Sequence, residues 1–365
     1  MVVVGGGPAG ATAARTLALL GLDVALLERS AGDDRPRPGE TLPPAVRPVL
    51  ARLGLADAVA ALDPTPSYGN VSAWGGPELR TSSFVFQPYG HGWHLDRSRF
   101  DELLRVEAAA AGATVRRGVR LTGCRRTADG SWRVTLAPGE ELRADGLIDA
   151  SGCSAALARS LGAWRDSHDR LVGVAVRYPG SADRRAGGYT LVEAGPDGWW
   201  YSASLPTGEL IVVQLTDADL CRAGRLADPR VFARRLAATE ATRARVSRPT
   251  PLDRPRVTPV SGHRLRRPDY VDRWVAAGDA ALGVDPLSSS GILRALLTGE
   301  AAAHALTHWL LGRPQAAVAY DHWLDTQHRD YLTARQQVYA QERRWPHRPF
   351  WQRRWACQRP RVSHL

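Results

Sequence analysis

The sequence predicts an α/β protein with three parts: a parallel-sheet unit at the N-terminus, a central antiparallel sheet and a helical C-terminal region. The first 28 residues follow the order strand, glycine-rich turn, helix and strand, which begins many doubly wound sheets. Apolar residues after position 312 recur at spacings of three, four, seven and eight, which is typical of helices. Alternating stretches that indicate antiparallel strands cover 172–178, 189–193, 199–205 and 209–216.

Composition narrows the class of protein. The chain has 365 residues, of which 44% are hydrophobic, and this is enough for a substantial core. All 48 basic residues are arginine, and the net charge is +11. The arginines are scattered and no nucleic-acid-binding motif occurs, so we expect no nucleic-acid partner.

The chain shows no signal for a membrane or an oxidising compartment. No apolar run reaches the roughly 18 residues of a spanning helix, so we expect no transmembrane segment. The sequence opens directly on a strand without the regions of a signal peptide, which predicts a cytoplasmic protein. The four cysteines lack metal-ligand spacing, so we expect neither a metal site nor a disulfide framework.

A dinucleotide fingerprint follows the first strand. Its glycines permit a tight turn, close approach of the backbone to a pyrophosphate and close helix packing. Glu28, at the end of the second strand and followed by Arg29, can accept both ribose hydroxyl protons, which favours FAD or NAD. We therefore expect contact with the cofactor at Gly5, Gly7, Pro8, Ala9 and Gly10.

Two later segments favour FAD. A buried strand at 273–277 runs into Gly278-Asp279, a pattern that resembles the second FAD fingerprint of flavoprotein monooxygenases, whose aspartate holds a ribityl hydroxyl. Residues 145–152 resemble the strand and turn that close such a domain. A second glycine fingerprint for nicotinamide is absent. We therefore expect an external reductant, either NAD(P)H that binds transiently or a separate flavin reductase.

These motifs predict a discontinuous FAD-binding domain of 1–62, 95–165 and 257–312. A substrate domain of 66–93 and 166–256 carries the antiparallel sheet and a helix over 228–246. Residues 313–365 form the C-terminal helical segment. An amphipathic helix is expected to begin near His94, with Phe100, Leu103, Leu104 and Val106 at helical spacing. Arg97 at its start resembles the arginine that lies beside the flavin in this class, although a surface arginine is an open alternative.

The aromatic and basic stretch 343–355 has two interpretations. Its rings can pack internally with arginines stacked outside, which ordinary burial favours. It can also form a patch for a membrane surface or a partner.

Further motifs carry a family resemblance. They are Pro38-Gly-Glu40-Thr-Leu-Pro43, Gly198-Trp-Trp-Tyr201, Thr216-Asp-Ala-Asp219, residues 285–292 and Arg343-Arg-Trp345 with Phe350-Trp351. Together they resemble the FAD-dependent monooxygenase and halogenase superfamily, with its Rossmann-like fold of the p-hydroxybenzoate hydroxylase (GR2) type. More closely, these motifs are similar to those of LodB-like flavoproteins, which modify tryptophan in a partner polypeptide during tryptophylquinone biogenesis. The resemblance implies flavin contacts at Gly39 and Glu40.

Two departures separate the chain from true halogenases. Those enzymes use a lysine to hold or direct hypohalous acid, and this chain has none. They also carry a glutamate where this chain has Ser288. We therefore expect no halogenation.

The small residues at 286–291, before the last long helices, are expected to lie against the flavin. Their backbone N–H groups can approach the N1 and O2 edge of the flavin, where the helix dipole stabilises negative charge. Ser288 and Ser289 leave space at the flavin face for an oxygen transfer. The expected cofactor contacts in this loop are Pro286, Ser289, Ser290, Gly291 and Ile292.

The resulting hypothesis is an FAD-dependent monooxygenase that hydroxylates an aromatic, indole-like substrate through a flavin C4a-hydroperoxide. The substrate is a small molecule or a tryptophan in a peptide or partner protein. Candidate bases are His91, His94 and Asp217, with Ser288 as a further catalytic residue. The pocket walls are expected to be Trp199, Trp200 and Tyr201.

Two other functions stay open. A reductase or dehydrogenase similar to geranylgeranyl reductases would act on a small natural product or isoprenoid. A flavin-binding chaperone would dock a partner through its basic aromatic tail.

Overall fold

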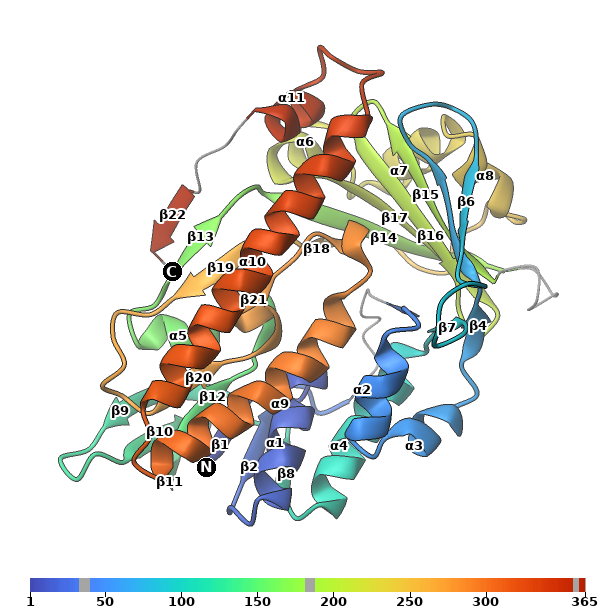
Figure 1. Ribbon diagram of the computed structural model, residues 1–365. Coiled ribbons are helices and arrows are strands. Elements are labelled where there is room, and N and C mark those ends of the chain that lie inside the picture. Colours follow the sequence, from blue (N-terminus) through green and yellow to red (C-terminus); the bar gives the residue numbers. More distant parts are fainter. Residues whose placement is uncertain (33–39, 181–187, 357–360, 365) are drawn as a thin grey trace.

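A computed structural model describes residues 1–32, 40–180, 188–356 and 361–364 (Figure 1). Its five-stranded parallel sheet has the order β20-β12-β1-β2-β8. The sheet therefore joins segments from three distant parts of the sequence. Its strands are β1 (Val2–Val4), β2 (Ala25–Glu28), β8 (Thr114–Arg117), β12 (Leu147–Asp149) and β20 (Trp274–Ala276).

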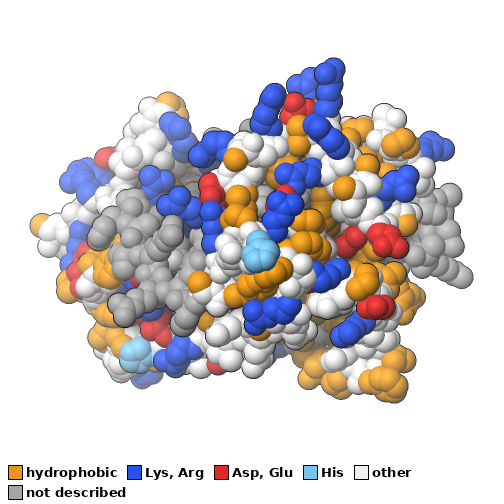
Figure 2. Space-filling model, turned by 90° about the horizontal axis from the view of Figure 1, so that it is seen from above, with side chains coloured by type: hydrophobic (Ala, Val, Ile, Leu, Met, Phe, Trp, Pro, Cys, Tyr) orange, Lys and Arg blue, Asp and Glu red, His pale blue; other side chains and the backbone are white. Residues whose placement is uncertain are grey.

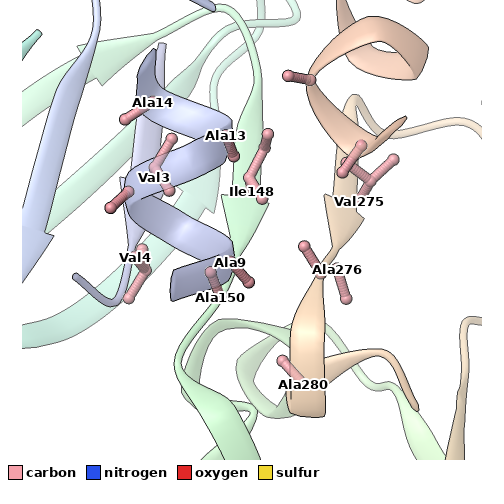
Figure 3. Close-up of a cluster of buried hydrophobic side chains, with 14 of the residues drawn as sticks. Val3, Val4, Ala9, Ala13, Ala14, Ile148, Ala150, Val275, Ala276 and Ala280 are labelled. Carbon is pink, nitrogen blue, oxygen red and sulfur yellow. The ribbon is translucent and has the colours of Figure 1, made fainter. Parts of the chain in front are cut away.

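Long helices pack beside this sheet. They are α1 (Pro8–Leu19), α4 (Arg97–Ala110) and α9 (Gly291–Leu310). Figure 3 shows the small side chains that lie between α1 and strands β1, β12 and β20. Ala9 and Ala13 of α1 lie near Ile148 and Ala150. Asp96 caps α4 by accepting N–H bonds from Ser98 and Arg99. Val106 is 52% exposed, so its expected place on the apolar face of this helix is wrong.

The second large sheet has seven strands in the order β18-β14-β17-β16-β15-β5-β6. Its pairs are antiparallel except β15 with β5. One face carries Trp199 and Val213, and the other carries Trp200 and Val212. The strands are β5 (Gly69–Ala73), β6 (Arg80–Ser83), β14 (Leu171–Pro179), β15 (Tyr189–Gly195), β16 (Gly198–Ser204), β17 (Glu209–Asp217) and β18 (Arg256–Pro259).

Short helices pack against the Trp200 face: α6 (Ala218–Ala223), α7 (Pro229–Ala237) and α8 (Ala241–Arg245). The single helix expected over 228–246 is therefore broken. The Glu193 carboxylate accepts the backbone N–H groups of Glu240 and Thr242, and this starts α8 as a separate turn.

Smaller elements complete the fold. Three-stranded sheets are formed by β3 (Thr41–Leu42), β7 (Gly92–His94) and β4 (Thr65–Ser67), and by β11 (Glu140–Ala144), β10 (Trp132–Leu136) and β9 (Leu121–Arg126). A four-stranded sheet contains β21 (Leu282–Gly283), β19 (His263–Arg266), β13 (Trp164–Ser167) and β22 (Arg361–His364). The remaining helices near the sheets are α2 (Val46–Arg52), α3 (Ala56–Ala60) and α5 (Ala156–Ser160), with short turns η1 (Gly152–Ser154), η2 (Gly278–Ala280) and η3 (Pro286–Ser288).

The C-terminal region contains α10 (Gln315–Gln341) and α11 (Pro349–Trp355). In Figure 1, α10 runs past the parallel-sheet unit up toward the seven-stranded sheet. Phe350 and Trp351 are fully buried, and the Arg344 guanidinium lies 4.4 Å from the ring centroid of Trp345. The internal-packing interpretation of this stretch is therefore confirmed. The region is not wholly helical, because β22 pairs with β13.

The molecular surface agrees with a scattered charge. Figure 2 shows arginine side chains spread among hydrophobic and acidic ones over the face seen from above. Within the described ranges, no helix combines the length and the hydropathy needed to cross a membrane.

Candidate active site

The glycine loop between β1 and α1 has one open side. Gly5 has φ +107°, and a Cβ there would lie 2.3 Å from the carbonyl oxygen of Ala150. A Cβ on Gly10 would lie 1.8 Å from the Gly5 oxygen. A Cβ on Gly7 would meet nothing within 4 Å. The first and last glycines are thus required by packing, whereas Gly7, before Pro8 and Ala9, leaves room for a ligand at the N-terminus of α1.

Glu28 fixes the shape of this loop through two hydrogen bonds to backbone N–H groups. One carboxylate oxygen accepts the N–H of Gly6 and the other accepts the N–H of Ser30, both at 2.8 Å. Arg29 is exposed. Arg105 of α4, only 2% exposed, donates to the carbonyl of Gly6 at 3.0 Å. Sequence reasoning missed Arg105, since no motif includes it.

The Gly278-Asp279 turn lies directly against the glycine loop. Gly278 has φ +60°, and a Cβ there would lie 2.7 Å from the Cβ of Ala9. Its N–H donates to Thr298 of α9 at 2.8 Å. Asp279 is exposed, and its carbonyl lies 2.8 Å from Nε2 of His263. Two motifs from opposite parts of the chain therefore share one site.

Arg97 connects this turn with the segment that follows residue 39. Burial lowers the pKa of Arg97, but the nearby carboxylates of Asp101, Glu40 and Asp279 outweigh it and leave its pKa above the usual value. Its Nε lies 3.2 Å from Asp101. The structure thus brings Glu40, Arg97 and Asp279 together. Pro38 and Gly39 lie outside the described residues.

A buried set of polar side chains adjoins Glu40, and we call Tyr201, Thr41, His94 and Thr190 the polar box. The Thr41 hydroxyl lies 2.9 Å from the Tyr201 hydroxyl and 3.1 Å from Nδ1 of His94. It is 3.3 Å from the Thr190 hydroxyl. Tyr201 also approaches Glu40 at 3.5 Å, and burial together with Glu40 raises the pKa of Tyr201.

His94 is fully buried within the polar box. Burial, together with the charge of Arg245, lowers the pKa of His94 to about 4. The imidazole is therefore neutral near pH 7. Its Nε2 has no hydrogen-bond partner among the described residues.

Residues 285–292 comprise the turn η3 and the first residues of α9. Ser288 Oγ donates to the carbonyl of Asp285 at 3.1 Å and lies 2.8 Å from Ser290 Oγ. Ser289 has φ +47°, an uncommon conformation for a residue with a side chain. A Cβ on Gly291 would meet nothing within 4 Å, whereas the Ile292 side chain enters the core. The start of α9 after Pro286 is thus an open helix N-terminus.

Two expected bases lie elsewhere. Both oxygens of Asp217 are engaged by α11, with Arg354 at 2.6 Å and Arg353 at 2.7 Å. The expectation that Asp217 is a base is therefore revised. Its carboxylate forms ion pairs that hold α11 against the sheet. His91 contacts Arg47 at 3.2 Å and the carbonyl of Gly92 at 2.8 Å, and among the described residues it forms no hydrogen bond with the polar box.

The expected aromatic wall is also revised. Side chains alternate along β16, so Trp200 points to the opposite face from Tyr201 and packs edge-on to Phe232 at 5.4 Å between ring centroids. Trp199 is fully buried in a core with Trp74 and Tyr339. Of these three aromatic residues, only Tyr201 belongs to the polar box.

The site can hold one extended dinucleotide. Gly7 and Gly291 leave open backbone at the starts of α1 and α9, and Asp279, which follows Gly278 in the adjoining turn, is exposed. Helix N-termini favour phosphate and other negative charge. These features fit FAD and define a flavoprotein of the Rossmann type.

Comparison with known proteins places the chain in a protein family. It belongs to the FAD binding domain family, whose model matches residues 1–342. It is 32% identical over 369 residues to LodB of Marinomonas mediterranea, described as an FAD-dependent oxidoreductase, and the match covers 97% of this chain and 96% of that protein. The protein is thus an FAD-dependent oxidoreductase of the monooxygenase and halogenase superfamily.

Solved structures share the fold. The flavin-dependent halogenase CmlS has a TM-score of 0.83 and 26% identity, covering 97% of this chain and 66% of that one. The peptidyl tryptophan dihydroxylase QhpG, essential for tryptophylquinone cofactor biogenesis, has a TM-score of 0.77 and 26% identity, covering 97% and 78%.

Proposed function

We propose that the protein is an FAD-dependent monooxygenase that hydroxylates an aromatic, indole-like ring, with a tryptophan in a peptide or partner protein as the preferred substrate. The observation that carries this is the polar box, which joins Tyr201 of the substrate sheet to Glu40, next to Arg97 and Asp279. The similarity to LodB along the chain supports an FAD-dependent oxidoreductase, and the similarity in fold to the peptidyl tryptophan dihydroxylase QhpG supports tryptophan as the substrate.

The chain's own residues would hold the cofactor. Gly7 and the start of α1 would bind the pyrophosphate, and Glu28 keeps the loop in shape. Asp279 would accept hydrogen bonds from ribityl hydroxyls, and the N–H groups before α9 would stabilise negative charge on the flavin. Bound FAD, once reduced, supplies the electrons that activate dioxygen.

The polar box takes up the proton that the aromatic ring releases. Tyr201 accepts the ring proton on its phenolic oxygen as it passes its own proton to Thr41, and Thr41 in turn passes its hydroxyl proton to Nδ1 of neutral His94. Hydroxyl groups suit such a relay because each can donate and accept. Of the expected candidate bases, the geometry thus favours His94, which acts through Tyr201.

Halogenation does not fit this site. The chain has no lysine, and Ser288 bonds within its own loop. Ser288 and Ser289 are small, so they leave room for the substrate ring. The reductant in this proposal is NAD(P)H bound transiently, or reduced flavin from a separate reductase.

Labelled dioxygen tests the function. The protein, loaded with FAD and supplied with NADPH or a flavin reductase, is incubated with ¹⁸O₂ and a tryptophan-containing peptide, with free tryptophan in parallel. We expect peptide product that carries ¹⁸O by mass spectrometry. Product without the label would refute oxygenation. Reduction of an isoprenoid in a separate incubation with the same reductant would favour the reductase alternative.

A further inference from the structure

Asp285, the first residue of the loop before α9, is held from outside the loop. It is buried, with 1% exposure. Its Oδ2 accepts a hydrogen bond from the Tyr339 hydroxyl at 2.6 Å, and its backbone N–H donates to the Tyr331 hydroxyl at 3.0 Å. Both phenols belong to α10. The loop is therefore fastened to the C-terminal helix.

Asp285 has several hydrogen-bond and charge partners. Its pKa is raised, chiefly by burial, and the charge of Arg335, also on α10, counteracts this only in part. Arg335 Nε lies 3.8 Å from Asp285, and Arg335 Nη2 lies 2.7 Å from Asp169. The loop itself adds one bond, from Leu287 N–H to Oδ1 at 3.0 Å. A buried carboxylate needs such partners, and most of them come from one helix.

The Tyr339 hydroxyl has a fixed orientation. It lies 3.0 Å from Nε1 of Trp199, and an indole N–H can only donate. Tyr339 must therefore accept from Trp199 and direct its own proton to Asp285. Burial raises the pKa of Tyr339 well above its usual value, so the phenol keeps this proton. The result is a directed chain from β16 of the seven-stranded sheet to the loop.

The loop needs this support. Ser289 adopts φ +47°, and a residue with a side chain stays in that conformation when its surroundings hold it there. The hydroxyls of Ser288 and Ser290 bond each other and the loop backbone. Within the described residues, the side-chain hydrogen bond and the ion pair that tie Asp285 to another element come from α10.

We propose that Tyr339 is a positioning residue for the flavin. Through Asp285 it holds loop 286–291 in the shape that binds the ring edge, and through Trp199 it links that shape to the sheet that covers the substrate. This inference rests on the placement of FAD in the proposed function. It requires nothing about the substrate.

The test is Tyr339→Phe, with FAD affinity and flavin reduction potential as readouts. Apo-protein is titrated with FAD by flavin fluorescence. We expect about tenfold weaker binding, because a buried charged acceptor loses one hydrogen bond. We also expect a more negative potential, since misplaced N–H groups stabilise the reduced flavin less. Tyr178→Phe is the matched control, because Tyr178 is buried on the other face of the sheet.

A double-mutant cycle shows whether Tyr339 acts through Asp285. Asp285→Asn is measured alone and with Tyr339→Phe. We expect the double variant to bind FAD about as weakly as the single variant with the lower affinity, because each single variant weakens the same charged hydrogen bond between Tyr339 and Asp285. Effects that multiply would overturn the proposal. So would unchanged affinity and potential in Tyr339→Phe.

Trp199→Phe tests the same chain from the sheet side if Tyr339→Phe folds poorly. It removes one donor and keeps a ring. We expect a shift of potential in the same direction and about two- to threefold weaker FAD binding. A shift in the opposite direction, or none, counts against the proposal. None of these readouts uses oxygen or an aromatic substrate, so they stand even if the hydroxylation assay fails.

Discussion

Gly278 and Ala9 touch across the junction of the two flavin motifs: a Cβ on Gly278 would lie 2.7 Å from the Cβ of Ala9. The turn η2, which follows strand β20, and helix α1 can approach this closely because Gly278 has no side chain and Ala9 has only a methyl group. The contact explains why a glycine fingerprint near the N-terminus and a Gly-Asp pair near residue 278 form a single site.

Gly278→Ala should therefore disrupt the site. The substitution adds a clash to a backbone at φ +60°, and together these should destabilise the fold by about 2–4 kcal/mol and abolish FAD retention. Urea unfolding and the flavin absorbance of purified protein measure both effects. Gly312→Ala is the control, because Gly312 has φ +80° and open space around it. Equal damage by both variants would show that the contact with Ala9 is unimportant.

Gly7→Ala separates ligand approach from packing. A Cβ there meets nothing within 4 Å, so the apo-protein should keep its melting temperature. FAD affinity should fall at least about tenfold, because the methyl group occupies space that the pyrophosphate needs. Thermal unfolding without FAD and fluorescence titration with FAD give the comparison. Wild-type affinity in this variant would remove Gly7 from the cofactor site.

His94 should make stability depend on pH. Its pKa is about 4 when folded and 6.5 in the unfolded chain, so only the unfolded chain takes up a proton between these values. The stability that neutral His94 contributes is thus present above pH 6.5 and lost as pH falls toward 4, by about 3 kcal/mol.

The variant His94→Gln isolates this contribution from that of His328, whose pKa is also lowered. Urea unfolding at several pH values should show that the variant loses about 3 kcal/mol less than wild type between pH 7 and pH 4. Parallel curves would mean that His94 is not buried in its neutral form.

The parts of the site that the sequence predicted are those where backbone geometry restricts the residue type. Gly5, Gly10 and Gly278 are such positions, since a side chain there meets backbone or a packed alanine. Side chains alternate along a strand, and this alone places Trp200 and Tyr201 on opposite faces of the sheet. The expectation that both line one pocket wall could therefore have been rejected from the sequence. Arg105 and the partners of Asp217 were beyond sequence reasoning, because their contacts join residues far apart in the chain.

Tyr201→Phe tests the proton relay. It removes the hydroxyl between Glu40 and Thr41 and keeps the ring. We expect hydroxylation in a single turnover to slow by about 10²-fold, as is typical for loss of acid–base assistance, with FAD affinity changed less than about threefold. Rapid-quench analysis of product measures the rate. Trp200→Phe on the opposite face should stay close to wild type, and a similar loss there would indicate general damage to the sheet.

A crystal structure of the protein with FAD and an indole ligand tests the central claim most directly. The account predicts the pyrophosphate at Gly7, the ribityl chain at Asp279, the ring edge against the start of α9 and the indole beside the Tyr201 hydroxyl. A flavin whose ring lies away from loop 286–291, or an indole bound on the Trp200 face of the sheet, would contradict it.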